Sequence, residues 1–232
     1  KMIEFLDDYS SVVIAGTSGY LTFIKFSPRY VSSSLRATKS SITCMKLDPS
    51  SKYIFIGDKE GRLTLVDKEK MTIIKTTKQH TGSINDAAFS PDGKTVATAS
   101  NDRMVKFFAF PELKLFLSNQ GHKSWVTSVT YSANGSKIIT TASDRKIRVF
   151  NSKTHQLIRV FDNLPSIPTC LVVNKSEDVY YVGFINGAVR VIDTNGAVKA
   201  QFDAHKSVTT SLNFYRQRNM LLSSSDDSTL CV

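Results

Sequence analysis

Three histidine–aspartate pairs stand at one fixed spacing in this 232-residue chain and raise the question of catalysis. Each aspartate follows its histidine by 22 residues, and in two of the three copies a serine lies two residues before the aspartate. An imidazole beside a carboxylate and a hydroxyl is the combination that activates a nucleophile in acyl transfer. The residues concerned are His80, Ser100 and Asp102; His122 and Asp144; and His205, Ser225 and Asp227.

The recurrence of this set argues against catalysis. An enzyme gathers such groups in one pocket, whereas here the same set returns in the same local frame along the chain. The histidines also belong to separate repeats, which does not suit a shared metal ion. The chain contains no phosphate-binding loop and no dinucleotide fingerprint. We therefore expect a structural role for the set, and no enzyme, catalytic residue, cofactor or metal site.

The spacing belongs to a repeat that covers the whole sequence. Equivalent positions are 42 residues apart four times and 41 residues apart once, and a bulky apolar residue follows each of the first five by six positions. A period of this length predicts an array of like supersecondary units. The six equivalent positions are Ser18, Glu60, Asp102, Asp144, Asn186 and Asp227.

One repeat shows which elements must position these residues. Short segments rich in β-branched and aromatic residues alternate with turns such as Ala133–Gly135, which is the pattern of hairpins. The pattern predicts strands over residues 126–131, 137–141, 146–150 and 156–161. Four antiparallel strands in about forty residues indicate a blade of a β-propeller. The fold class predicted is all-β.

The motifs resemble those of the WD-repeat family of β-propellers over essentially the whole chain. The resemblance rests on Gly121-His122 with Ser143-Asp144, and on the copies that contain His80 with Asp102 and His205 with Asp227. It implies a non-catalytic protein-interaction scaffold. It also implies a hydrogen-bonded network of histidine, a strand-two serine or threonine, aspartate and a third-strand tryptophan.

The sequence departs from the family pattern at several positions. Phe108 and Phe150 replace the tryptophan, and phenylalanine has no N–H to donate. Ser100 and Ser225 are placed at the serine position, whereas Ala142 takes that position in the fourth repeat, which leaves only His122 and Asp144 there. The first, second and fifth repeats lack the pair, so we expect them to depend on apolar packing alone.

We predict a single domain with no internal boundary and about six blades. The last repeat stops inside its third strand, and the chain begins within the pattern, so we expect part of a longer propeller, with seven blades favoured. An open end would expose unpaired strand edges. The approximate repeats are residues 1–36, 37–78, 79–120, 121–162, 163–203 and 204–232, the last incomplete.

Composition limits the partners and the compartment. The formal net charge is +10 and the isoelectric point is near 9.5, which permits acidic proteins, nucleic acid or an anionic membrane surface as partners. The longest apolar stretches are about five residues, so no segment spans a membrane. Cys44 and Cys170 are equivalent in different repeats and should not pair, which indicates a reducing compartment, cytoplasmic or nuclear.

Basic residues gather beside the repeated aspartates and form the candidate partner-binding face. They lie on the loops that enter the first strand and on the turns between strands two and three, at the same end of a blade. Two interpretations remain open. The lysines are solvated and Trp125 packs on the next blade, or the face binds an acidic or phosphorylated segment of another protein in a larger assembly. The residues are Lys39, Lys59, Arg103, Lys123, Trp125, Arg145 and Lys206.

Two other functions follow from the charge. Association with nucleic acid or a ribonucleoprotein would show a strong salt dependence, although no platform of interleaved aromatic and basic residues is present. Phosphoinositide binding ranks lower and membrane association is not expected. One subgroup of propellers binds phosphoinositides and carries a Phe-Arg-Arg-Gly motif. That motif is absent here, and Tyr215-Arg-Gln-Arg218 is a poor substitute.

Overall fold

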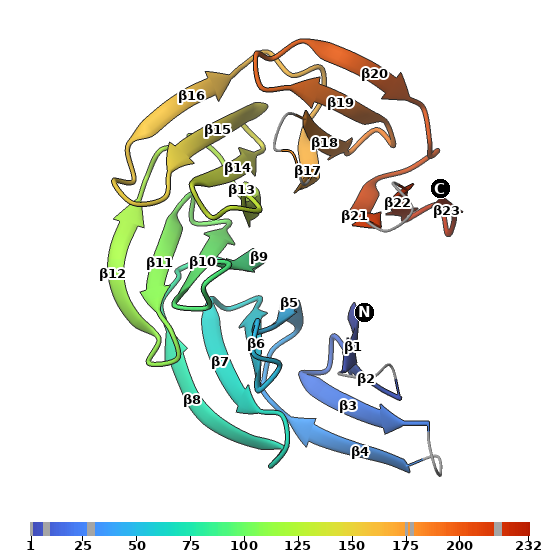
Figure 1. Cartoon of the computed structure of the whole chain (residues 1–232). Helices are drawn as coiled ribbons and strands as arrows, with labels where there is room; N and C mark the ends of the chain where they lie inside the picture. Colours follow the sequence, from blue (N-terminus) through green and yellow to red (C-terminus); the bar gives the residue numbers. More distant parts are fainter. Residues whose placement is uncertain (1, 7–9, 27–30, 175, 177–178, 216–219) are drawn as a thin grey trace. The chain divides into compact units, whose positions relative to one another are not determined.

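The chain folds into consecutive antiparallel sheets (Figure 1). Over the described part of the chain there are six of them, five with four strands and the last with three, which confirms the all-β class and the blade pattern of a β-propeller. The same residues contain no helix of the length and apolar character that a membrane span requires. The computed structural model describes residues 2–6, 10–26, 31–174, 176, 179–215 and 220–232.

The first three sheets each pair their strands in sequence order. Sheet 1 consists of β1 (Met2–Leu6), β2 (Ser11–Ala15), β3 (Tyr20–Lys25) and β4 (Val31–Arg36). Sheet 2 consists of β5 (Ile42–Leu47), β6 (Tyr53–Asp58), β7 (Arg62–Asp67) and β8 (Thr72–Lys78). Sheet 3 consists of β9 (Ile84–Phe89), β10 (Thr95–Ser100), β11 (Val105–Ala109) and β12 (Lys114–Asn119).

The last three sheets follow the same order. Sheet 4 consists of β13 (Val126–Tyr131), β14 (Lys137–Ala142), β15 (Lys146–Asn151) and β16 (Leu157–Phe161). Sheet 5 consists of β17 (Pro168–Val173), β18 (Val179–Phe184), β19 (Val189–Asp193) and β20 (Val198–Phe202). Sheet 6 consists of β21 (Thr209–Tyr215), β22 (Met220–Ser225) and β23 (Leu230–Cys231). The strands predicted in the fourth repeat are confirmed to within one residue at each end.

Contacts divide the chain into two compact units. The first contains residues 1–102 and 107–117, and the second contains residues 103–106 and 118–232. Sheets 1 and 2 lie wholly in the first unit, and sheets 4 to 6 lie wholly in the second. The grouping of all repeats in one domain stays a prediction.

Packing inside each unit follows from the two-residue period of a strand. In β6, Ile54 and Ile56 pack with the apolar residues of sheet 1, whereas Phe55 between them packs with those of sheet 3. Successive side chains point to opposite faces of a sheet, so a middle strand that is covered on both sides must be apolar throughout. The outer strand β8 has no such cover and is mostly exposed.

At Gly61 the turn between β6 and β7 closely approaches the loop that enters sheet 3. Gly61 has φ of 82°, and its carbonyl accepts the main-chain N–H groups of Gln79 and His80. A Cβ atom on Gly61 would lie 2.3 Å from the carbonyl oxygen of His80. Since that oxygen belongs to the backbone, a side chain here would force the two segments apart.

Candidate functional site

The first histidine–aspartate pair links the loop before β9 to the turn after β10. His80 Nδ1 lies 2.8 Å from Oδ2 of Asp102, and Nε2 lies 2.7 Å from Oγ1 of Thr98. The main-chain N–H of Thr81 donates to the same Asp102 oxygen at 3.1 Å. The imidazole is fully enclosed, with a side-chain exposure of 0%. Both ring nitrogens are therefore occupied by buried partners.

The second pair contains an additional cation. His122 Nδ1 lies 3.1 and 3.2 Å from the two carboxylate oxygens of Asp144, and Nε2 lies 2.8 Å from Oγ1 of Thr140. Arg148 on β15 donates from Nη1 to Asp144 at 2.9 Å and also contacts Nδ1 of His122. A buried carboxylate needs several donors, and here a guanidinium and an imidazole supply them together with the N–H of Lys123.

The third pair is joined through a hydroxyl. His205 Nδ1 lies 2.8 Å from Oγ1 of Thr229, and that hydroxyl donates to Asp227 at 2.6 Å. The direct distance from Nδ1 to the Asp227 carboxylate is 3.4 Å. Nε2 lies 2.8 Å from Oγ of Ser223. The threonine therefore relays the contact between imidazole and carboxylate.

The hydroxyl partner of each histidine lies two residues earlier than the sequence interpretation placed it. Thr98, Thr140 and Ser223 contact the imidazoles, whereas Ser100 and Ser225, which were named as network members, bond the main chain of the aspartates. Residues two apart share one face of a strand, and only the reach of the imidazole decides between them.

Ser100 and Ser225 join their networks at the aspartate and not at the imidazole. Ser100 Oγ instead accepts the N–H of Asp102 and donates to the carbonyl of Gly82. Ser225 Oγ likewise accepts the N–H of Asp227. Ala142 does not interrupt the fourth network, because Thr140 completes it.

Sheet 2 has a polar pair of its own, contrary to the expectation of apolar packing alone. Thr38 takes the histidine position and donates from Oγ1 to Oδ2 of Asp58 at 2.6 Å. Oδ1 of Asp58 accepts the N–H groups of Glu60 and Arg62. The usable signal in the sequence was a hydroxyl residue 20 positions before an aspartate, in place of a histidine 22 positions before one.

Sheet 5 shows the apolar alternative. Leu164 takes the histidine position and Val182 takes the hydroxyl position, and both are buried. Asn186, at the aspartate position, is exposed. The expectation of apolar packing is confirmed for this sheet, where the two apolar side chains belong to one core cluster.

Stability should depend on pH through His122. Burial, and then the guanidinium of Arg148, lower the pKa of this imidazole from 6.5 to about 4, against the opposing effect of Asp144. The unfolded chain then binds this proton more readily than the folded chain. Stability is therefore complete above about pH 6.5 and falls as the pH drops towards about 4, with a limiting slope of about 1.4 kcal/mol per pH unit.

Urea unfolding of wild type and His122→Gln over that pH range checks this expectation. The variant should be less stable at neutral pH but should lose less stability on acidification. Equal slopes for the two proteins would contradict the assignment. Asp144 should not contribute in this window. Burial raises the pKa of its carboxyl, but the N–H of Lys123 and the charges of His122 and Arg148 outweigh burial and hold it below its ordinary value.

The seven residues of the candidate face are all exposed. In the second compact unit, main-chain contacts bring three of them close together. The N–H of Lys123 donates to Asp144 at 3.1 Å, and the carbonyl of Trp125 accepts the N–H of Ser143 at 2.8 Å. Arg145 follows directly on the same turn. We name Lys123, Trp125 and Arg145 the sheet-4 cluster.

The exposure of Trp125 bears on the two interpretations of this surface. Its exposed fraction is 57%, so more than half of the side chain is open to solvent. A tryptophan side chain is rarely left in water without a reason, because its burial is worth more than that of most side chains. The exposed indole, with a lysine and an arginine beside it, suits a ligand that carries negative charge.

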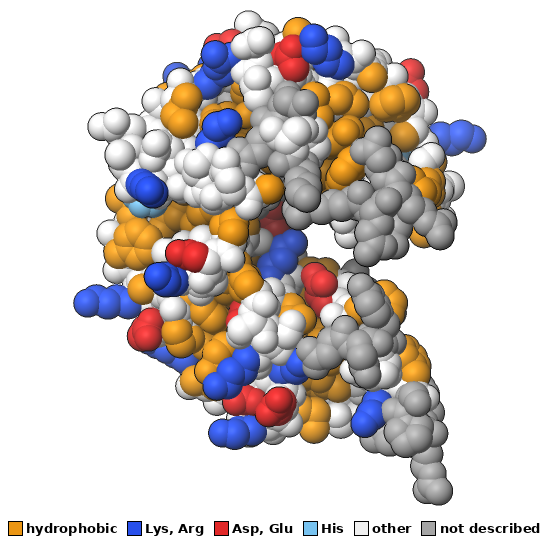
Figure 2. Space-filling model, in the orientation of Figure 1, with side chains coloured by type: hydrophobic (Ala, Val, Ile, Leu, Met, Phe, Trp, Pro, Cys, Tyr) orange, Lys and Arg blue, Asp and Glu red, His pale blue; other side chains and the backbone are white. Residues whose placement is uncertain are grey.

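The remaining residues of the candidate face lie in similar local settings. Lys206 donates its N–H to Asp227 at 2.8 Å in sheet 6, and Arg103 follows Asp102 on its turn with φ of 71°. In the first compact unit, Lys39 and Lys59 follow the bonded residues Thr38 and Asp58. Figure 2 shows lysine and arginine side chains scattered over the face drawn, with hydrophobic and other side chains between many of them. The sheet-4 cluster is thus the local group that carries an aromatic anchor.

Metal binding and thiol chemistry can also be judged from the described residues. They contain no group of three or more histidine, cysteine, aspartate or glutamate side chains that could hold a metal ion. Cys44, Cys170 and Cys231 form no disulfide bond with one another. Burial raises the pKa of the Cys44 thiol to about 12. A thiol with this pKa stays protonated and unreactive. Tyr215-Arg-Gln-Arg218, weighed for lipid binding, lies outside the residues whose side chains are described.

A family model agrees with the geometry of the three pairs. The model described as WD domain, G-beta repeat matches residues 71–108, 113–151 and 196–232. These are the segments that contain the three histidine–aspartate pairs.

Curated proteins match over shorter stretches. Eukaryotic translation initiation factor 3 subunit I of Drosophila willistoni is 36% identical over 72 residues, 31% of this chain and 22% of that protein. WD repeat-containing protein 36 of Homo sapiens is 29% identical over 99 residues, 43% of this chain and 11% of that protein. WD repeat-containing protein 3 of Mus musculus is 33% identical over 67 residues, 29% of this chain and 7% of that protein. The chain therefore matches less than a quarter of the length of each relative.

Proposed function

Since the chain belongs to the WD40 repeat family, whose members are generally protein-interaction scaffolds, we propose that it is a non-catalytic scaffold within a multiprotein complex. In this proposal the sheet-4 cluster holds an acidic or phosphorylated segment of a partner. The observation that carries the proposal is the exposure of Trp125, at 57%, beside Lys123 and Arg145.

The chemistry of the cluster supports this ligand class. Tryptophan and arginine are the residues that most often dominate a binding interface, and an arginine fork matches a carboxylate or phosphate with two hydrogen bonds. The net charge of +10 attracts an acidic partner from a distance and speeds its association. Asp144 does not compete for such a ligand, because its oxygens already accept bonds from His122, Lys123 and Arg148.

The burial of the three pairs supports a non-catalytic role. Side-chain exposure is 0% for His80, 1% for His122 and 0% for His205. A general base must come within hydrogen-bond reach of a substrate proton. These imidazoles are enclosed by the fold and have both nitrogens occupied, so they serve to join loops to turns.

The relatives support membership of a complex. One is by name a subunit of a translation initiation factor. We place this protein in the cytoplasm or nucleus, and its three cysteines, which form no disulfide bond with one another, suit a reducing compartment. Association with nucleic acid remains the alternative function, favoured by the net charge.

A pull-down with the variant Arg103→Glu, Arg145→Glu, Trp125→Ala tests the proposal. We expect recovery of bound proteins to fall at least about tenfold, because two cations and the aromatic anchor are lost together. The matched control is Lys153→Glu with Ile158→Ala, which changes charge and apolar surface on another turn and strand of sheet 4. Nuclease treatment before the pull-down identifies binding through nucleic acid. Unchanged recovery of partners by the triple variant would contradict the proposal.

A further inference from the structure

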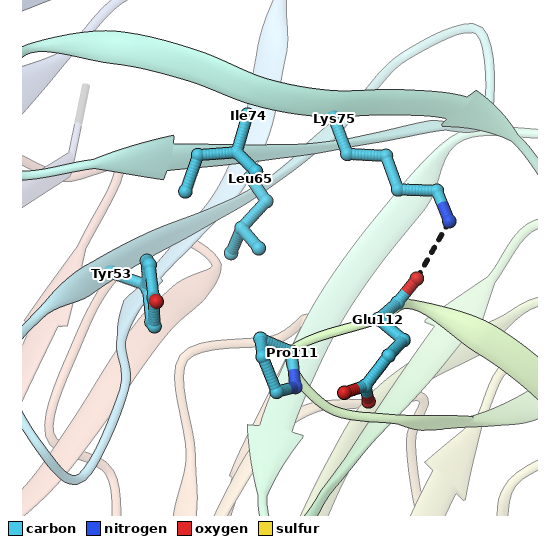
Figure 3. A pocket seen from close by; sticks show the side chains of 6 residues that line it. All are labelled: Tyr53, Leu65, Ile74, Lys75, Pro111 and Glu112. Carbon is cyan, nitrogen blue, oxygen red and sulfur yellow. Dashed lines mark hydrogen bonds between the residues drawn. The ribbon is translucent and has the colours of Figure 1, made fainter.

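A groove opens at the outer edge of the first compact unit, between β8 of sheet 2 and the turn that follows β11 in sheet 3 (Figure 3). Its volume is about 380 Å³. Apolar side chains form most of its walls, and none of them belongs to the candidate face. The lining residues are Tyr53, Leu65, Ile74, Lys75, Pro111 and Glu112.

A β-bulge places Ile74 over this groove. Leu65 pairs with Lys75 and Val66 pairs with Ile73, so Ile74 has no partner on β7. The extra residue of a bulge turns its side chain away from the regular pleat. Ile74 is 51% exposed, and Figure 3 shows it above Leu65 on the side of the groove that faces Tyr53 and Pro111.

Aromatic packing fixes the opposite walls. The ring of Tyr53 lies edge-to-face with Phe110, with centroids 5.8 Å apart, and Phe110 contacts Phe89 in the same manner at 4.8 Å. These edge-to-face contacts hold the Phe110-Pro111 turn against sheet 2. The groove is thus formed before a ligand arrives, which lowers the entropic cost of binding.

Two ammonium groups and one carboxylate lie at or beside the groove. Lys75 Nζ donates to the main-chain carbonyl of Glu112 at 2.6 Å, so this contact does not neutralise the ammonium group (Figure 3). Lys52 Nζ lies 5.1 Å from the centroid of the Tyr53 ring, and that ring lines the groove. The Glu112 carboxylate lies below, beside Pro111. If a ligand inserts an apolar side chain into the groove, carboxylates next to that side chain in the ligand would interact with the ammonium groups of Lys52 and Lys75.

The equivalent place between sheets 4 and 5 lacks these walls. Ile158 occupies the same bulge position and is 53% exposed, and Arg159 donates to the carbonyl of Thr194 as Lys75 does to that of Glu112. Lys137 and Asn195, however, stand where Tyr53 and Pro111 stand. The bulge therefore recurs along the chain, but the apolar walls distinguish the groove in the first unit.

We propose that this groove binds one leucine-sized side chain of an acidic segment of a partner protein. The apolar walls recognise the inserted side chain, and Lys52 and Lys75 recognise carboxylates on either side of it. The site is separate from the sheet-4 cluster, so it would give the scaffold a second point of attachment. Two weak attachments on one partner multiply their affinities when both can be engaged together.

The test uses the fluorescein-labelled peptide acetyl-Asp-Glu-Leu-Glu-Asp-amide and fluorescence anisotropy. Ile74→Glu should weaken binding about tenfold, because it removes an apolar wall and repels the flanking carboxylates. Lys75→Met should weaken it about threefold, since it keeps the apolar stem but removes the charge. Ile158→Glu is the matched control, with the same change at an equally exposed bulge, and should bind as wild type does. Glycine in place of the peptide leucine should abolish the difference between wild type and Ile74→Glu.

A second measurement locates the peptide directly. With photo-leucine at the central position, illumination should attach the peptide to the segment around Ile74 or to the Phe110-Pro111 turn. Attachment around Trp125 instead would overturn the groove proposal and leave the proposed function standing. Equal binding by wild type and Ile74→Glu, or an equal loss in Ile158→Glu, would also overturn it. Thermal unfolding of each variant confirms that the compared proteins are folded.

Discussion

Gly61→Ala is expected to lower the free energy of unfolding by about 4 kcal/mol, a large effect for the addition of one methyl group. The new Cβ would lie 2.3 Å from the His80 carbonyl oxygen and 2.7 Å from its carbon. Relief of this clash would pull apart the two segments that Gly61 joins, and with them the bonds from the N–H groups of Gln79 and His80 to its carbonyl. The positive φ of 82° adds a further cost for any residue with a side chain.

Gly93→Ala is the matched control for this prediction. Gly93 also has a positive φ, 68°, but a Cβ there would meet only the side chain of Pro49 at 3.8 Å, an ordinary contact. Its cost should be about 1 kcal/mol, from the backbone conformation alone. Urea unfolding followed by circular dichroism compares the two variants. If both lose the same stability, the close approach of Gly61 to His80 does not restrict the fold.

His80→Leu is expected to lower the free energy of unfolding by about 3 kcal/mol. The change leaves the buried hydroxyl of Thr98 without its imidazole partner and takes a donor from Asp102. Removal of one side chain from a buried hydrogen-bonded network costs more stability than replacement of all of them by apolar or neutral residues. The remaining polar side chains still carry the penalty of burial but have lost a partner.

Sheet 5 supplies the second half of this experiment. Leu164, Val182 and Asn186 occupy the three equivalent positions there, and the first two are buried. The triple variant His80→Leu, Thr98→Val, Asp102→Asn should therefore recover more than half of the stability lost by His80→Leu. Strictly additive losses, with the triple variant the least stable, would contradict the view that the three side chains act as one unit.

The repeat predicted much of this fold because it is a property of residue types at fixed intervals. The resemblance to the WD-repeat pattern placed His80 beside Asp102 and His122 beside Asp144. It could not choose between Thr98 and Ser100, which share a face of β10, and it overlooked Thr38 with Asp58 because neither is the residue type sought at its position.

Features that depend on how neighbouring strands and sheets pack could not be predicted from the sequence. The contact of Arg148 with both His122 and Asp144 depends on which way a strand residue turns. The groove beside Ile74 depends on a bulge in β8 and on packing against the next sheet. No residue pattern predicted the bulge or the packing. The exposure of Trp125 likewise required the arrangement of its loop against the turn at Ser143.

The central claim is that the aspartates hold the fold while the basic residues beside them bind the partner. Trp125 is the sole tryptophan of the chain, so its fluorescence reports on the sheet-4 cluster directly. We expect titration with an acidic phosphoserine peptide to shift its emission saturably to shorter wavelength. Arg145→Glu should remove the shift and leave thermal unfolding unchanged, whereas Asp144→Asn should lower the unfolding temperature. An emission that does not change while the peptide binds, or that changes equally in Arg145→Glu, would contradict the account.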